Sequence, residues 1–232
     1  MEVDRIQGQT MRAITSELNV LTRSDGSAIV TQGGSCCIAS VNGPLEVNSA
    51  NLDMNKAYVD VIYRPKSGLP GVNERYKEKL VKSLCETSII TQLYPRTQIT
   101  VQTQEMDDHG GLLACAINVV NLAIMNSGLE MKFYMAAVHC GLDKDDNIVI
   151  DPDYVPNANL SFSRVQKSSR SQNFKGNFTF VFESLKQSVI GVNTDGKFTL
   201  KQYNEAQKTC QQASRKIFDF YRELVKKYAV VL

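Results

Sequence analysis

The sequence predicts an α+β fold in which helices cover the faces of antiparallel or mixed sheets. Three observations lead to this prediction. Strand-like segments gather before each helical stretch instead of alternating with helices one by one. The segment 111–128 is apolar on nearly every side, as a helix buried between other elements must be. After Thr199, apolar residues recur at helical spacing, which indicates a long helix at the end of the chain.

The first half begins with a predicted meander of three short strands, SELNVL, SAIVTQ and SCCIASV, between residues 16 and 41. Turn-forming residues at 24–26 and 33–34 separate them. The third strand is expected to end at Gly43-Pro44, because proline has no N–H to donate to a ladder. A fourth strand, AYVDVIY, covers residues 57–63 and runs into the loop RPKSGLPG.

The helices and remaining strands follow from periodicity and capping residues. Asn73 is a candidate N-cap for an amphipathic helix with Tyr76, Leu80 and Leu84 on one face. Gly128 should end the apolar helix, and Thr199 with Gln202 forms a capping box for the last one. Further strands are predicted at 98–104, 133–142, 147–152, 158–166 and 177–184.

Composition describes an ordinary globular protein of 232 residues, which we take as one domain over 1–232 with a flexible segment at 1–15. Its 26 Lys and Arg against 24 Asp and Glu give a net charge of +2, so any nucleic-acid contact must be a local patch. No apolar run approaches the roughly 20 residues that span a bilayer, and the polar start lacks a signal-peptide core. We therefore expect a protein that is neither membrane-spanning nor secreted.

Six cysteines are scattered, mostly within apolar segments, and none forms a Cys-x-x-Cys pair or a Cys/His cluster. This pattern favours free buried thiols in a reducing compartment. The spacing does not suit zinc, so no metal site is predicted.

Several local motifs resemble the RNase PH family over nearly the whole chain. They comprise the opening segment 11–47 with its Asp-Gly-Ser turn, Arg75-x-x-Glu78, Tyr94-Pro95-Arg96-Thr97, and the run His109-Gly110-Gly111-Leu112-Leu113-Ala114. Within the family the chain looks most like metazoan RNA exosome ring subunits that carry no appended RNA-binding domain. The resemblance implies the RNase PH fold, with two related βαβ-type halves packed around one core.

The same resemblance implies that the phosphate site is degenerate. Active family members continue their Gly-Gly pair as Thr-Arg-Thr-Ala, where a helix N-terminus, hydroxyls and a guanidinium hold the attacking phosphate. Here those positions read Leu112, Leu113 and Ala114. Losing a bidentate Arg–phosphate contact costs on the order of a few kcal/mol, or several powers of ten in occupancy or rate. No catalytic residue is therefore assigned.

A second deficit follows Asp151-Pro152-Asp153-Tyr154, where active relatives place further acidic residues. Asn157 and Ser161 fall in that region, and neutral side chains bind Mg²⁺ poorly. Asp151 and Asp153 themselves are either a surviving acid pair or a strand-ending turn, and we favour the turn. The acidic residues between 143 and 146 are interpreted as a solvated turn. His109 and His139 are far apart in sequence with no nucleophile matched to either.

Basic residues concentrate around the first predicted helix and its flanking loops. Most are expected to form a solvated helical face with local acidic partners. The candidates for RNA contact are Arg75, Arg96, Arg64 and Lys66, of which the first two match family positions that face the RNA path.

The resemblance implies a function without catalysis. We expect a subunit of a six-membered ring of RNase PH-like proteins, joined by RNA-binding cap proteins, that threads single-stranded RNA toward a separate nuclease. Its roles would be rRNA maturation, mRNA decay and RNA surveillance in nucleus, nucleolus and cytoplasm, with no cofactor. The alternatives are an active phosphorolytic exoribonuclease, a separate homodimeric nuclease, or a free RNA- or DNA-binding protein.

Overall fold

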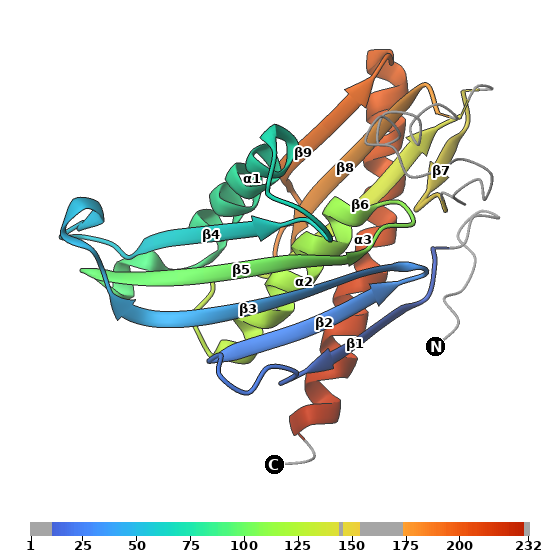
Figure 1. The fold of residues 1–232 in the computed structure, drawn as a ribbon. Helices are drawn as coiled ribbons and strands as arrows, with labels where there is room; N and C mark the ends of the chain where they lie inside the picture. Colours follow the sequence, from blue (N-terminus) through green and yellow to red (C-terminus); the bar gives the residue numbers. More distant parts are fainter. Residues whose placement is uncertain (1–10, 144–145, 154–173, 230–232) are drawn as a thin grey trace.

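Two sheets form the framework of the chain (Figure 1). The computed structural model describes residues 11–143, 146–153 and 174–229. The first sheet has five strands in the order β1 (Ile14–Leu18), β2 (Gly26–Gln32), β3 (Ser35–Glu46), β5 (Thr97–Asp107) and β4 (Tyr58–Arg64). The second has four in the order β7 (Ile148–Ile150), β6 (Met135–Leu142), β8 (Gly176–Glu183) and β9 (Val189–Gly196).

Three α-helices pack on these sheets: α1 (Val72–Ser88), α2 (Leu112–Ser127) and α3 (Leu200–Ala229). Helix α2 lies between β2 and β3 of the first sheet and β6 of the second, which explains why it is apolar on nearly every side. Helix α3 covers β6, β7 and β8, and α1 packs on β4 beside β9. The predicted α+β class is confirmed, since helices cover largely antiparallel sheets.

Helix α2 is also joined to the second sheet and to α3 through polar contacts. The carboxamide of Asn118 donates to the Ala137 carbonyl at 3.0 Å and accepts from the Ala137 N–H at 2.8 Å. The Tyr221 hydroxyl of α3 donates to the same carboxamide oxygen at 3.1 Å. Because these groups are buried, each bond removes a desolvation cost that would otherwise destabilise the packing.

Most predicted elements are confirmed with small shifts in their bounds. Gly128 caps α2 in the left-handed conformation, and the Thr199 and Gln202 side chains cap α3 reciprocally, with the Thr199 N–H donating to Gln202 at 2.8 Å. The predicted βαβ arrangement appears in the first half, where β4 and β5 are parallel and α1 connects them. In the second half, all the described strands pair antiparallel, a difference from that prediction.

Two local predictions were wrong. Strand β3 does not end at Gly43-Pro44 but continues to Glu46, because a bulge between Asn42 and Leu45 leaves the proline outside the ladder. Helix α1 starts at Val72 rather than after an Asn73 cap, and the Glu74 carboxylate accepts the Gly71 N–H at 2.8 Å.

The buried face of α1 matches the predicted one in part. Leu84 is buried and Leu80 half-buried, as predicted, and Val81 and Cys85 are buried with them. Tyr76 is instead exposed and donates from its hydroxyl to Asn193 on β9 at 3.1 Å. Strand β9 was not predicted at all.

Some predictions fall partly outside the structure. The strand predicted at 158–166 lies outside the described residues, as do residues 1–10 of the segment predicted to be flexible. Ile14 and Thr15 from that segment belong to β1. The single domain over 1–232 stays a prediction. No helix in the described ranges has both the length and the apolarity required of a membrane span.

Candidate functional site

The resemblance places an anion site at the start of α2. A tight turn leads into this helix. Gly110 and Gly111, at the end of β5, have φ values of 103° and 65°, a region that side chains with a Cβ rarely adopt. A Cβ on Gly111 would lie 3.2 Å from Asp151 Oδ1 and 3.3 Å from His139 Cβ. Glycine therefore lets the head of α2 approach the end of the second sheet closely.

A buried ion pair, which the sequence did not reveal, occupies this junction. Arg12 donates from Nη2 to Asp151 Oδ1 at 2.6 Å and from Nε to Asp151 Oδ2 at 3.0 Å. Its other contacts are with the carbonyls of His109 at 3.1 Å and Gly110 at 2.8 Å, and with Asp153 at 3.4 Å. These contacts account for all five N–H donors of the guanidinium.

This environment keeps the guanidinium of Arg12 charged. Burial alone would lower the pKa of Arg12, but the hydrogen bonds and negative charge of Asp151 outweigh it, so the pKa is raised. Asp151 itself has φ 49° just after β7, as the predicted strand-ending turn requires. The carboxylate is therefore part of a turn and of an ion pair that ties β7 to the segment before β1.

The three degenerate positions face the interior. Leu112, Leu113 and Ala114 are all buried and belong to the main apolar cluster. The first turn of α2 thus presents hydrocarbon where the resemblance assigns hydroxyls and a guanidinium. Arg12 lies beside it but does not replace that guanidinium, because its donors are already used within the chain.

The two histidines lie close to the same turn despite their separation in sequence. His109 Nδ1 lies 2.9 Å from the Gly34 carbonyl. His139 is buried on β6, with Nδ1 3.1 Å from Thr179 Oγ1. Burial lowers the pKa of His139 to about 4, and the nearby Arg12 lowers it too while Asp151 acts in the opposite direction. At neutral pH His139 is therefore uncharged.

The acidic candidates give no metal site within the structure. Asp146 pairs with Lys175 at 2.8 Å in the turn after β6, whereas Asp145 lies outside the described residues. Asn157 and Ser161, from the degenerate acidic region, also lie outside them. Among the described residues, no group of three His, Cys, Asp or Glu side chains could hold a metal ion.

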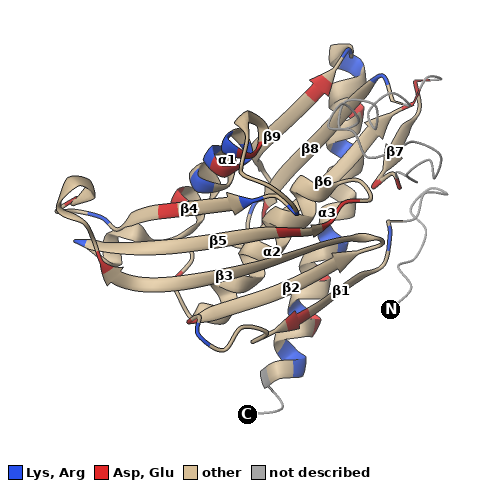
Figure 2. Cartoon of the chain, viewed as in Figure 1, with Lys and Arg blue, Asp and Glu red and all other residues tan. Residues whose placement is uncertain are grey.

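Three of the four RNA-contact candidates lie at the carboxyl end of β4. This is the same end of the first sheet at which β5 leads to the start of α2. Arg64 ends β4 and is exposed. Lys66 pairs with Asp107 at 3.1 Å, and Arg75 pairs with Glu78 at 2.9 Å. Figure 2 shows basic and acidic residues intermixed along α1 and around this end of the sheet. The two paired cations are exposed, so these contacts are weak.

Arg96 lies at the other end of the sheet. It precedes β5, and the parallel pairing sets Arg64 opposite Gln104, so about 25 Å of strand separates the two arginines. Its φ is 61°, and its N–H donates to the Asp53 carbonyl at 3.2 Å. The structure therefore does not bring Arg96 together with the other three candidates.

Lys77 also departs from the predicted solvated face. Its ammonium donates at 2.8 Å to the buried Glu105, which also accepts from the Tyr63 hydroxyl at 2.9 Å. Burial, followed by the charge of Glu105, raises the pKa of Tyr63. This network fixes α1 to β4 and β5 under the basic residues.

Residues 10–130 match the RNase PH family model, which is described as "3' exoribonuclease family, domain 1". The chain belongs to the RNase PH family. Among its relatives, the Arabidopsis thaliana "Exosome complex exonuclease RRP46 homolog" is 35% identical over 156 residues, or 66% of this chain and 65% of that protein. The rice protein of the same name is 28% identical over 99% of this chain and 98% of its own.

A solved structure agrees with the RNase PH fold of this chain. The crystal structure of rice Rrp46 matches with a TM-score of 0.83 and 25% identity, over 94% of this chain and 96% of the rice chain. An archaeal exosome core matches with a TM-score of 0.73 at 16% identity, covering 94% of this chain and 91% of its own, and supports the fold alone. The predicted RNase PH-like fold and family are therefore confirmed.

Proposed function

We propose that this chain is a non-catalytic ring subunit of an RNA exosome, which supports 3′-to-5′ RNA processing and decay by building the channel through which RNA passes. The observation that carries the proposal is the start of α2. Three apolar residues occupy the first turn, and the adjacent guanidinium is fully engaged by Asp151, Asp153 and two carbonyls.

Phosphorolysis requires an inorganic phosphate beside the RNA backbone. Two anions come together only where cations offset their repulsion, and buried or directed charges do this best. At the start of α2 the pair formed by Arg12 and Asp151 carries no net charge, and the N-terminus of the helix alone supplies about half a positive charge. A neutral ion pair and a helix N-terminus together favour anion binding far less than an unpaired arginine would.

The relatives are named as exosome complex proteins, which supports a place for this chain in such a complex. In the proposed assembly this chain joins five other RNase PH-like subunits, RNA-binding cap proteins and a separate nuclease. Arg64, Lys66 and Arg75 contact single-stranded RNA along its backbone, a contact that needs few cations and no base readout. We propose the nucleus, nucleolus and cytoplasm as its locations.

An exonuclease is the second candidate. The Arabidopsis and rice relatives carry "exonuclease" in their names, and residues 154–173, which include the degenerate acidic region, lie outside the described structure. An active enzyme of this family, alone or as a homodimer, would release nucleoside diphosphates when phosphate is supplied.

One assay distinguishes the non-catalytic subunit from the exonuclease. Purified chain, checked for its mass by light scattering, is incubated with single-stranded RNA labelled throughout its length, with and without inorganic phosphate and Mg²⁺. The proposal predicts no phosphate-dependent release of nucleoside diphosphates by either monomer or dimer. Release that requires phosphate and continues after further purification would refute the non-catalytic assignment.

A further inference from the structure

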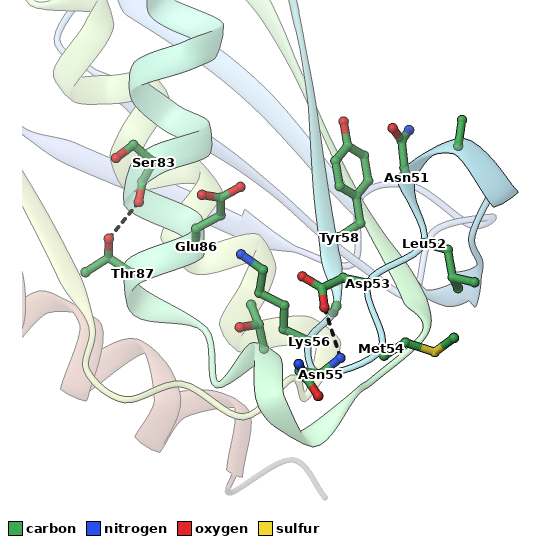
Figure 3. Close-up of a pocket in the computed structure, with 13 residues that line it drawn as sticks. Asn51, Leu52, Asp53, Met54, Asn55, Lys56, Tyr58, Ser83, Glu86 and Thr87 are labelled. Carbon is green, nitrogen blue, oxygen red and sulfur yellow. Dashed lines mark hydrogen bonds between the residues drawn. The ribbon is translucent and has the colours of Figure 1, made fainter.

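A pocket lies at the end of the first sheet that is farthest from the start of α2. Its volume is about 820 Å³, and it is lined by the segment 50–58, by Ser83, Glu86 and Thr87 on the last turns of α1, and by Thr91. Figure 3 shows Glu86 of α1 pointing toward the loop that carries Asp53 to Lys56, with the Lys56 side chain reaching toward α1, whereas Ser83 and Thr87 lie on the other side of the helix in this view. None of the residues assigned to RNA contact or to the anion site lines it.

Hydrogen bonds hold the loop in this position. The Ala57 N–H donates to the Thr91 carbonyl at 2.9 Å, and the Asp53 side chain accepts from the Asn55 N–H at 3.0 Å. Lys82 donates to the Tyr58 hydroxyl at 3.2 Å and lies 4.3 Å from the centre of its ring. The walls of the pocket are thus formed in the chain itself, which lowers the entropy lost when a partner binds.

Exposed apolar side chains surround the pocket. Leu45, Leu52, Met54 and Leu93, which we call the distal patch, are between 44% and 60% exposed. Backbone contacts bring their segments together, because Leu45 pairs with Gln98 and the Arg96 N–H bonds to the Asp53 carbonyl. Single exposed apolar residues are common, but several around one pocket mark an interaction surface.

The charges of the pocket indicate what binds there. Asp53 and Glu86 contribute two carboxylates from opposite walls, against one ammonium from Lys56. This balance favours a basic side chain and disfavours a phosphate backbone. The aliphatic distal patch likewise suits apolar protein side chains, and the Lys82 ammonium already lies over the ring of Tyr58, the aromatic residue of the pocket lining.

We infer that the distal patch and its pocket dock a neighbouring RNase PH-like subunit, through a segment that places an arginine or lysine between Asp53 and Glu86 and apolar residues on the patch. This inference rests on the proposed ring and names a surface that builds it. A stable contact covers about 800 Å² on each partner, so the pocket forms its centre and not its whole extent.

The test uses the native assembly purified from cells through a tag on the full chain. Native mass spectrometry of the wild-type assembly first asks whether the chain resides in a ring with other RNase PH-like subunits. A free wild-type chain would overturn the proposed function, and the docking inference with it. A wild-type chain in the ring leaves the function standing, and the variants then test the surface alone.

Leu52→Glu with Met54→Glu, and separately Glu86→Lys, should each lower the share of chain found in the ring by about tenfold or more. The matched control is Leu185→Glu, which is 73% exposed on the turn between β8 and β9. It should leave the ring population within about twofold of wild type. All three variants must keep the wild-type melting temperature, since the substituted side chains are exposed.

Amide hydrogen exchange provides a second measurement that does not depend on variants. Exchange in segments 50–58 and 83–87 should slow by at least about tenfold in the ring relative to the free chain. Unchanged exchange in a chain that resides in the ring, or wild-type ring levels for Glu86→Lys, would overturn the inference. So would equal protection of the free chain by a single-stranded oligouridine, because the occupant would then be RNA.

Discussion

Replacing Arg12 with methionine tests whether the ion pair at the head of α2 joins the two sheets. The side chain of Arg12 is 12% exposed and that of Asp151 is fully buried. Methionine keeps much of the apolar stem but removes every guanidinium donor. Asp151 then retains the Arg12 backbone N–H, at 3.2 Å, as its contact with this segment.

The expected cost is large because the remaining charge stays buried. Removing one partner of a buried pair typically destabilises a protein by about 3–5 kcal/mol, whereas exposed pairs contribute about 0–1 kcal/mol. The destabilisation caused by Arg12→Lys should fall between these two ranges. Lysine keeps the charge, but its ammonium cannot reproduce the planar guanidinium that reaches Asp151 and two carbonyls.

Urea unfolding followed by circular dichroism measures these costs. Arg75→Met is the matched control, because it breaks an exposed pair with Glu78 and should cost less than about 1 kcal/mol. The double variant Arg12→Met with Asp151→Leu should lose less than the sum of the two single changes, since neither charge is left alone. A loss below about 1 kcal/mol for Arg12→Met would refute a structural role for the pair.

Three further predictions concern charge at the same end of the molecule. His139→Gln should flatten the pH dependence of stability between about pH 4 and 6.5, measured by urea unfolding. The pKa of His139 is lowered to about 4, so the unfolded chain binds more protons there and wild-type stability falls by roughly 3 kcal/mol as the pH drops through that window. Leu113→Arg should create saturable phosphate binding by calorimetry without RNA turnover, because the second deficit remains in the acidic region. Arg64→Ala and Arg75→Ala should each reduce the salt dependence of RNA binding by about one unit of slope in anisotropy titrations, whereas Arg96→Ala should leave the slope unchanged, because Arg96 lies at the other end of the sheet.

Periodicity predicted the elements whose environment is uniform. Helix α2 is apolar on all sides because both sheets pack on it. Its end can be predicted from the local sequence because Gly128 caps it. Strand β9 was missed because its residues are half-buried and two glycines interrupt its pattern. The end of β3 was misplaced because a bulge, which has no strong sequence signal, removes the proline from the ladder.

The candidate site was predictable only in its local part. The degenerate phosphate site could be predicted from one segment, because Leu112, Leu113 and Ala114 directly follow the glycine pair. The pairing of Arg12 with Asp151 joins residues 139 positions apart, and no local pattern predicts it. The same limit applies to Arg96, whose distance from Arg64 depends on the parallel pairing of β4 with β5.

The non-catalytic function requires that the start of α2 does not hold phosphate. Titrating inorganic phosphate into isotope-labelled wild-type chain, while following the backbone amide signals of Gly110, Gly111 and Leu113, tests it directly. We expect no saturable shift up to about 10 mM phosphate, which corresponds to binding weaker than about 3 kcal/mol. Saturable shifts at these amides with a dissociation constant below about 1 mM would contradict it.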